Sequence, residues 1–287
     1  MSINQISQMS IMAPEWGKSL ADAEKEIRQM LTEFPIREED SKKSLMLAMQ
    51  YLQMLLNLKE VTSTSMASSV DPTVLTGSAL NQEDYLQICR DKGSSIDYFR
   101  HFYCSRLYLG YLFRRRDVSE KMVEALEEIA EQAKFCASIQ TIVETFYMGL
   151  VAADILQGRA TADTDTDTNR WQKVAADSLH SLKKWADEGS EWNFQHKADL
   201  LRAEIAVANG DVATAISSYQ SAILGAGNSC HINEEALSCE RAGLFFIQQG
   251  EIEDGRIYLL RAETLYNVWG AHRKAQDVSS LIKERCS

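Results

Sequence analysis

One short stretch of the chain carries side chains that can hold a charged ligand: Asn193, His196 and Lys197. Their spacing places them near one another at the entry of a predicted helix. In one interpretation, Asn193 and His196 form a polar corner that binds a peptide carboxylate or a neighbouring domain. In the other, Asn193 is the N-cap of the helix and His196 is bonded to a backbone carbonyl. The frequency of asparagine at N-caps favours this second, structural interpretation.

Two groups of histidine and cysteine residues could begin a metal site. His101 and Cys104 are three residues apart, and Cys230, His231 and Cys239 are near one another in sequence. A structural zinc site needs four tetrahedral ligands at short spacings. Neither group supplies them, and single buried cysteines are common in protein interiors. We therefore predict no metal site and no cofactor.

Three alternating aspartates, Asp163, Asp165 and Asp167, are similar to the opening of a calcium-binding loop. An EF-hand loop also needs a glycine at its sixth position and a glutamate at its twelfth. Thr168 and Val174 occupy those positions, so the pattern fails. Weak, nonspecific calcium contact is the alternative to a simple solvated loop.

The one tight basic cluster, Arg114-Arg115-Arg116, closes an aromatic-rich segment. Cations are expected at the negative end of a helix, and this interpretation is favoured. The alternative is an anchor for an acidic peptide or a phosphate.

Four tryptophans could line a ligand pocket, although core packing between helices is the more usual role of such residues. They are Trp171, Trp185, Trp192 and Trp269. No set of Ser, His and Asp or of Cys and His is spaced to indicate nucleophilic catalysis. We therefore predict no catalytic residues and a chain that is not an enzyme.

The elements that carry these residues are predicted to be helices. Only three prolines and 14 glycines interrupt 287 residues, so long helices are allowed and a β-sandwich is disfavoured. Helical spacing of apolar residues predicts the following segments: 14–32, 38–58, 82–91, 96–113, 119–133, 137–156, 171–185 and a tail helix over 272–283. Two polar stretches, 61–79 and 160–169, are predicted loops, and the first of them is predicted to be mobile.

A repeat in the last third organises these helices. Gly210, Ala215, Tyr219 and Ala222 are each followed, 40 residues later, by a partner. The partners are Gly250, Gly255, Leu259 and Ala262. A fixed period of this size is typical of stacked helical hairpins. We predict two 40-residue units at about 196–227 and 234–269, and earlier hairpins at about 96–135 and 137–187.

The predicted fold is therefore an all-α solenoid of about four hairpins. Residues 81–287 form the repeat domain. Residues 1–80 form an N-terminal helical cap with a mobile loop.

The run Gly210-Asp211-x3-Ala215-x3-Tyr219-x2-Ala222 resembles the second half of a tetratricopeptide repeat. The first half departs from that family, because Asp199 and Arg202 stand where large apolar residues are expected. The period is also longer than the usual 34 residues. The chain is tetratricopeptide-like rather than a consensus array.

A longer ordered set of motifs covers roughly residues 81–280 and is similar to the helical repeat region of large signalling ATPases. The motifs are Trp185-Ala186, Asn193-Phe194-x-His196-Lys197, Leu200-Leu201-x-Ala203-Glu204, Glu235-Ala236-Leu237-x2-Glu240, Tyr258-Leu259-x2-Ala262 and Tyr266-x2-Trp269-Gly270-Ala271. In that family, kinase-like, AAA-type ATPase and sensor histidine kinase domains accompany the repeats. The chain contains no GxxxxGK[ST], HRD or DFG motif. The resemblance therefore implies the helical connector without the enzymatic activities.

Charge and cysteine usage restrict the partners and the compartment. The net charge is −11, so the chain has no general electrostatic reason to bind nucleic acid or an anionic membrane. The six cysteines form no CxxC pair, which predicts reduced thiols in the cytoplasm. No signal peptide and no run of about 18 apolar residues is recognisable.

The best functional prediction is a groove lined by the first helix of each repeat. Mapping the repeat offsets places there Lys197, Leu200, Glu204, Val207 and Ala208 in one unit, and Leu237, Glu240, Leu244, Ile247 and Gln248 in the next. Such a mixture suits a helical or extended peptide. We predict a non-enzymatic adaptor that binds proteins or peptides in signal transduction. The alternative is a detached regulatory segment of a multi-domain kinase or ATPase sensor.

Overall fold

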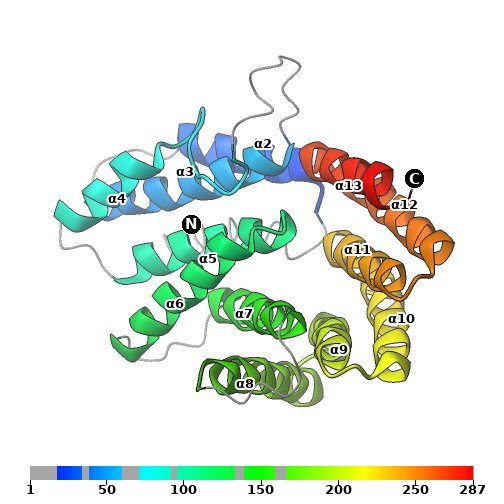
Figure 1. Ribbon diagram of the computed structural model, residues 1–287. Coiled ribbons are helices and arrows are strands. Elements are labelled where there is room, and N and C mark those ends of the chain that lie inside the picture. Colours follow the sequence, from blue (N-terminus) through cyan, green and yellow to red (C-terminus); the bar gives the residue numbers. More distant parts are fainter. Residues whose placement is uncertain are drawn as a thin grey trace. The chain divides into compact units, whose positions relative to one another are not determined.

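The computed structural model describes residues 18–33, 39–59, 71–91, 96–132, 139–158 and 166–286. Within these ranges every regular element is a helix, and twelve are present (Figure 1). In chain order they are α2 (Leu20–Glu33), α3 (Glu39–Lys59), α4 (Gln82–Asp91), α5 (Ile96–Leu112), α6 (Arg116–Gln132), α7 (Ile139–Gln157), α8 (Thr166–Glu188), α9 (Glu191–Ala208), α10 (Val212–Asn228), α11 (Ile232–Gln248), α12 (Ile252–Trp269) and α13 (His272–Arg285). The predicted all-α class is confirmed for this part of the chain.

Contacts between residues divide the chain into two compact units. Unit 1 consists of Met1–Gln140 with Val268–Lys274, and unit 2 of Thr141–Asn267 with Ala275–Ser287. The division falls inside the predicted repeat domain rather than near residue 80. The predicted boundary at residue 80, which concerns membership of the repeat, stays a prediction.

In unit 1, helix α3 packs on α5 through polar as well as apolar contacts. The Gln50 amide donates to the carbonyl of His101 and to the hydroxyl of Ser105, each at 2.9 Å. Helices α5 and α6 approach closely where Gly110 faces Ser119, whose hydroxyl lies 2.7 Å from the position that a Cβ at Gly110 would take. These small and polar contacts accompany a fully buried apolar core that includes Leu55 and Leu107.

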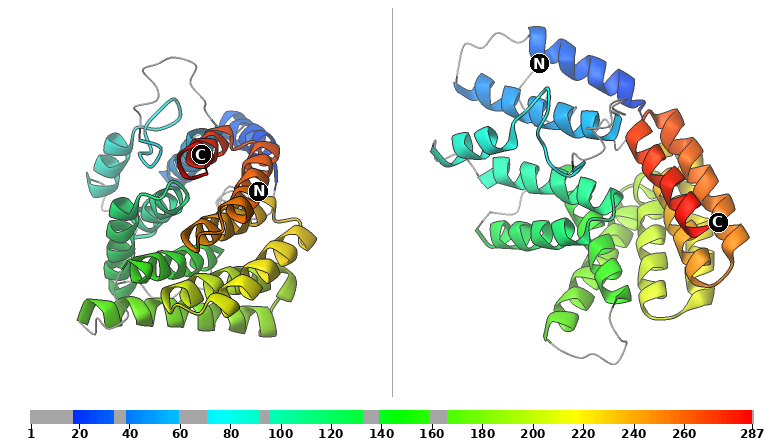
Figure 2. Two further views of the ribbon diagram at one scale, coloured as in Figure 1. Left: turned by 45° about the vertical axis from the view of Figure 1, so that its right-hand side comes forward. Right: turned by 45° about the horizontal axis from the view of Figure 1, so that its top comes forward.

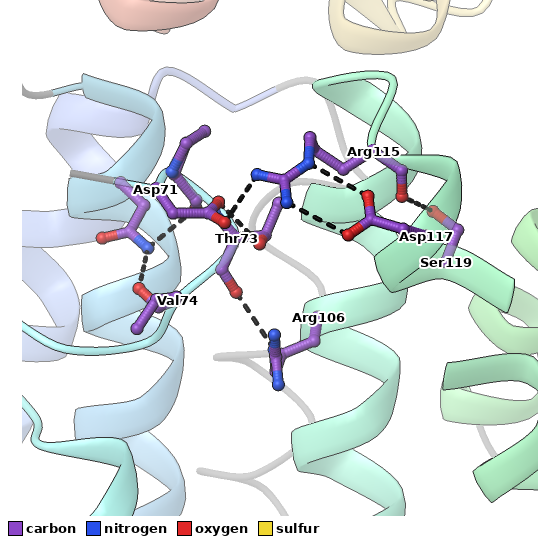
Figure 3. A network of polar contacts seen from close by, with 9 residues as sticks. Asp71, Thr73, Val74, Arg106, Arg115, Asp117 and Ser119 are labelled. Atoms are coloured by element: carbon purple, nitrogen blue, oxygen red, sulfur yellow. Dashed lines mark hydrogen bonds and ion pairs between the residues drawn. The ribbon is translucent and has the colours of Figure 1, made fainter. Parts of the chain in front are cut away.

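The segment between α3 and α4 is anchored by Arg106 of α5 and by Arg115, which precedes α6, as Figure 3 shows. The Asp71 carboxylate accepts from Arg115 at 2.6 Å and from the backbone and hydroxyl of Thr73 at 2.9 and 2.7 Å. Arg106 donates to the Thr73 carbonyl at 3.1 Å. Residues 71–79 form no helix, in agreement with the predicted loop over 61–79, and specific bonds hold them in place; the mobility stays a prediction. Residues 61–70 lie outside the described ranges.

The junction between α12 and α13 is part of unit 1. The Trp269 indole donates to the Lys18 carbonyl at 2.9 Å, and the Lys274 ammonium donates to the Leu112 carbonyl. Both side chains are almost completely buried, so they find backbone acceptors in place of water.

In unit 2, α7 to α12 run as consecutive antiparallel pairs (Figure 1 and Figure 2). Small residues allow the helices of a pair to approach. A Cβ at Gly149 of α7 would lie 2.7 Å from Ser178 of α8, and one at Gly243 of α11 would lie 2.8 Å from Leu259 of α12. The absence of a Cβ at Gly149 and Gly243 is therefore what allows these helices to pack closely.

Helix α8 begins earlier than predicted. Thr166–Asn169, expected to be loop, forms its first turn, while residues 159–165 lie outside the described ranges. The negative charge of Asp167 is favourable at the positive end of a helix, and Thr168 is buried there. Local composition therefore underestimated the helix.

The turns inside the two C-terminal hairpins share one geometry. Gly210 has φ +72° and Gly250 has φ +87°. The backbone amide of Asp211 donates to the Ala206 carbonyl, and the backbone amide of Glu251, 40 residues later, donates to the Phe246 carbonyl, each at 2.9 Å. This six-to-one bond, after a residue with left-handed backbone, is the Schellman ending of a helix. The repeat predicted from sequence is therefore also present in the backbone hydrogen bonds.

The same ending occurs at two residues that are not glycine. Cys230 has φ +59° and Arg114 has φ +55°. The backbone amide of His231 donates to the Ala226 carbonyl at 2.9 Å, and that of Arg115 donates to the Gly110 carbonyl at 2.8 Å. The arginine cluster consequently lies in a turn, and its last member, Arg116, opens α6 instead of closing α5. Arg114 and Arg115 thus lie in the turn that ends α5, and only the predicted position of Arg116 is corrected.

Candidate functional site

The polar corner predicted at the start of α9 has a different arrangement from either interpretation. Ser190 is the N-cap, with extended backbone, and its hydroxyl accepts from the Asn193 backbone amide at 3.3 Å. Asn193 is exposed within the first turn and does not cap the helix. The prediction of an Asn193 cap is therefore wrong, because α8 ends at Glu188 and the chain turns at Ser190.

His196 and Lys197 face inward and join α9 to the start of α11. Lys197 Nζ lies 2.6 and 2.8 Å from the two carboxylate oxygens of Glu234, and His196 Nε2 contacts the same carboxylate. The ring of His231 lies 4.6 Å from that of His196 between centroids. We call these four residues the α9–α11 cluster. His196 thus pairs with a carboxylate, not with the backbone carbonyl that was predicted.

Charge pairing explains why the α9–α11 cluster is stable in the interior of unit 2. His196, Lys197 and Glu234 are each at most 3% exposed. Burial would raise the pKa of Glu234, but the positive charge of Lys197, followed by His196, outweighs it and lowers the pKa. A buried charge is tolerated when it is paired in this way. These side chains are therefore committed to holding helices together.

Glu204, another predicted groove residue, is the centre of a second buried network. It is completely buried, and Arg241 donates to its two carboxylate oxygens at 3.0 and 2.6 Å. Tyr219 adds a bond at 2.7 Å and Gln157 one at 2.9 Å. Arg241 also reaches Asp154 at 3.2 Å. One carboxylate thus links four helices, α7, α9, α10 and α11.

Other residues assigned to the groove are interior as well. Leu200 and Leu237 are buried, and the buried Glu240 accepts from Tyr266 at 3.0 Å. With Lys197 and Glu204, five of the eight principal groove residues are therefore inside unit 2. The repeat offsets located the face on which helices stack, and stacking covers it. Toward the ends of α9 and α11, Val207 and Leu244 are half-buried and Gln248 is exposed.

Apolar side chains instead reach the surface on α12. Ile257 and Leu260 are 63% and 42% exposed, and Val268 in the last turn of the same helix is 67% exposed. Their spacing, with the exposed Thr264 between them, places them along one stripe of the helix. We call this stripe the α12 outer face. It was not predicted from the sequence.

The equivalent stripe of α10 is mostly polar. Forty residues before Ile257 and Leu260 stand Ser217 and Gln220, both exposed. Leu224 is the one large apolar side chain on that stripe, and it corresponds to Thr264. A comparison of outward positions between the two repeats was the sequence signal that could have revealed the α12 outer face.

The remaining residues considered from the sequence are His101, the tryptophans and the possible metal ligands. The His101 ring contacts Tyr51 Oη at 2.7 Å and Gln140 Oε1 at 3.0 Å, and burial lowers its pKa to about 4. Trp171 and Trp269 are buried, consistent with a core role, whereas Trp192 is 57% exposed. Among the described residues, no group of three or more His, Cys, Asp and Glu side chains is arranged to hold a metal. None of the described helices has the length and apolarity needed to cross a membrane.

Comparison of the chain with family models, curated proteins and solved structures finds no match in any of the three. The class defined by the structure is therefore the coarse one: an all-helical protein whose helices pack in consecutive pairs, as in a helical repeat array. The resemblances to tetratricopeptide repeats and to the repeat region of signalling ATPases stay predictions.

Proposed function

We propose that this chain is a non-enzymatic, tetratricopeptide-like scaffold that binds other proteins through the α12 outer face. The observation that carries this proposal is the exposure of Ile257 and Leu260 on a helix whose repeat equivalent presents Ser217 and Gln220. Helix stacking within the array does not cover this face, because the equivalent residues are exposed on both α10 and α12. Exposed apolar side chains in line on one helix are typical of an interaction surface.

The spacing of the apolar residues defines the shape of the partner. Positions 257, 260, 264 and 268 follow the three-and-four pattern by which one helix packs on another. The partner that fits is an amphipathic helix with an apolar stripe of the same spacing. The stripe is narrow, with three large apolar side chains, so it is too small for the area that a stable dimer of the chain would bury.

Charge next to the stripe indicates which amphipathic helix binds best. Glu251, Glu253 and Asp254 are all exposed at the start of α12, and Glu253 is 82% exposed at its side chain. Arg256 lies 3.6 Å from Glu253 and neutralises part of this charge. The remaining acidic excess favours a partner with lysine or arginine at the end of its helix that lies over this turn.

The test exchanges the α12 residues for their own repeat equivalents. The full chain and the double variant Ile257→Ser with Leu260→Gln are used for capture from native lysate, and captured proteins are then purified and titrated by calorimetry. We expect a partner whose binding segment is an amphipathic helix with basic residues, and at least ten-fold weaker binding by the double variant. Unfolding in urea should show the variant to be as stable as the wild type, within about 0.5 kcal/mol.

Leu224→Thr on α10 is the matched control, because Thr264 is its equivalent on α12. It removes an exposed apolar side chain of unit 2 but leaves the α12 outer face intact. We expect it to bind the partner like the wild type. Equal binding by all three chains would contradict the proposed surface. A captured protein that binds through an extended segment would contradict the proposed class of partner. So would capture of a nucleic acid.

A further inference from the structure

A buried histidine in unit 2 has surroundings that disfavour its protonation. His231 occupies the N-cap position of α11, where its side chain makes no capping bond. It is 6% exposed, and its Nδ1 is buried without a hydrogen-bond partner. Its neighbours in the α9–α11 cluster include the cation Lys197 and a second imidazole, His196.

The charges that face His231 come from both helices. From α9 they are Lys197 and His196, which oppose a further positive charge, and from α11 it is Glu234, which favours one. Glu234 is already in contact with both Lys197 and His196. Burial is the largest influence and, with Lys197 and His196, outweighs Glu234 and a backbone hydrogen bond with Ser229 and lowers the pKa of His231 to about 4.

We propose that the α9–α11 cluster is an acid-sensitive latch, in which protonation of His231 adds a positive charge beside Lys197 and loosens the start of α11 from α9. This inference does not depend on the proposed function. The neutral ring completes the contact at neutral pH. The protonated ring lacks an uncommitted carboxylate within the cluster. The contact between the start of α11 and α9 therefore opens, and water hydrates the charged ring.

The direction of the pH effect follows from the two states of His231. An exposed histidine has a pKa near 6.5, so the opened state binds the proton more readily than the closed state. The closed state therefore loses stability as the pH falls below about 6.5, and the loss is complete near pH 4. At pH 5 Glu234 is still ionised because its pKa is lowered, so the Lys197–Glu234 pair persists while His231 takes up the proton in the opened state.

Hydrogen–deuterium exchange of the full chain at pH 7 and pH 5, expressed as protection factors, tests the latch. We expect protection over residues 191–200 and 229–240 to fall on the order of ten-fold at pH 5 in the wild type. His231→Gln, which cannot take up the proton, should keep most of its protection. His180→Gln is the matched control, because His180 is exposed on α8, and it should respond like the wild type.

A second measurement covers the possibility that His231→Gln does not fold. The ring of His231 in the wild-type chain is titrated by NMR, and we expect its protonation well below pH 6.5, together with the loss of protection. Titration near pH 6.5 without a change in protection would overturn the latch. So would an equal loss of protection in the wild type and a folded His231→Gln variant.

Discussion

The hairpins α9–α10 and α11–α12 have the same backbone plan but differ in polarity at equivalent positions. Both turn at a glycine with positive φ, and both return through the same Schellman bonds. Where the first hairpin buries Lys197 and Glu204, the second has Leu237 and Leu244 at the equivalent positions. The two hairpins therefore share their backbone geometry and their small residues, whereas their other side chains differ.

The outer faces differ in the same sense as these interior positions. The first hairpin presents polar residues on α10, and the second presents apolar residues on α12. Buried charge links the first hairpin to its neighbours on either side, through Glu204 and through the α9–α11 cluster. Buried charges of α9 and α11 therefore join the two hairpins to each other and to α7, while the exposed apolar residues of α12 distinguish the second hairpin.

The largest expected effect is the loss of the Glu204 carboxylate. Glu204→Ala leaves Arg241 buried beside an empty site, and we expect a loss of about 3–5 kcal/mol in the free energy of unfolding, measured in urea. Leu244→Ala, at the equivalent position of the second hairpin, should cost about 1–2 kcal/mol, because Leu244 is half-buried and carries no partner charge.

A double variant separates lost charge pairing from lost packing. Glu204→Leu with Arg241→Leu removes both charges and should recover most of the stability that Glu204→Ala loses. If Glu204→Ala and Leu244→Ala cost the same, the contrast between the two hairpin interiors has no energetic meaning.

A smaller effect is expected at the two turn glycines. Gly210→Ala and Gly250→Ala should each cost about 1–2 kcal/mol in urea unfolding, because an L-residue is strained at positive φ. No heavy atom lies within 4 Å of an added Cβ at either glycine, so the two costs should agree. Clearly unequal costs would show that the turns are not equivalent.

The smallest effect is a gain at the turn that joins the two hairpins. Cys230 adopts the left-handed backbone that the other turns give to glycine, so Cys230→Gly should stabilise the chain by about 0.5–1 kcal/mol. Thermal unfolding under reducing conditions would measure it, with Cys239→Ser, a buried cysteine in ordinary helical backbone, as a destabilised comparison. A loss of stability in Cys230→Gly would mean that the cysteine side chain contributes more than its backbone strain costs.

Much of the fold was predictable because its signals are local. Apolar spacing located the helices, and the residue pairs 40 apart, Gly210 with Gly250 and Ala222 with Ala262, identified the repeat. Both kinds of signal depend on backbone geometry, which a few neighbouring residues determine. The predicted elements left room for turns between 113 and 119 and between 227 and 234, but nothing in the residue types of Arg114 and Cys230 indicated their left-handed backbone.

The candidate site was less predictable because burial depends on residues far apart in the chain. Lys197 and Glu234 are 37 positions apart, and Arg241 is equally far from Glu204. Each of these charges resembles a solvated groove residue until its partner is placed beside it by stacked helices. Helical periodicity places a residue on a face of its helix, but the neighbouring helices decide which face is covered. Sequence therefore located the helices and turns of this protein, and tertiary packing decided that Lys197 and Glu204 are interior while Ile257 and Leu260 face the solvent.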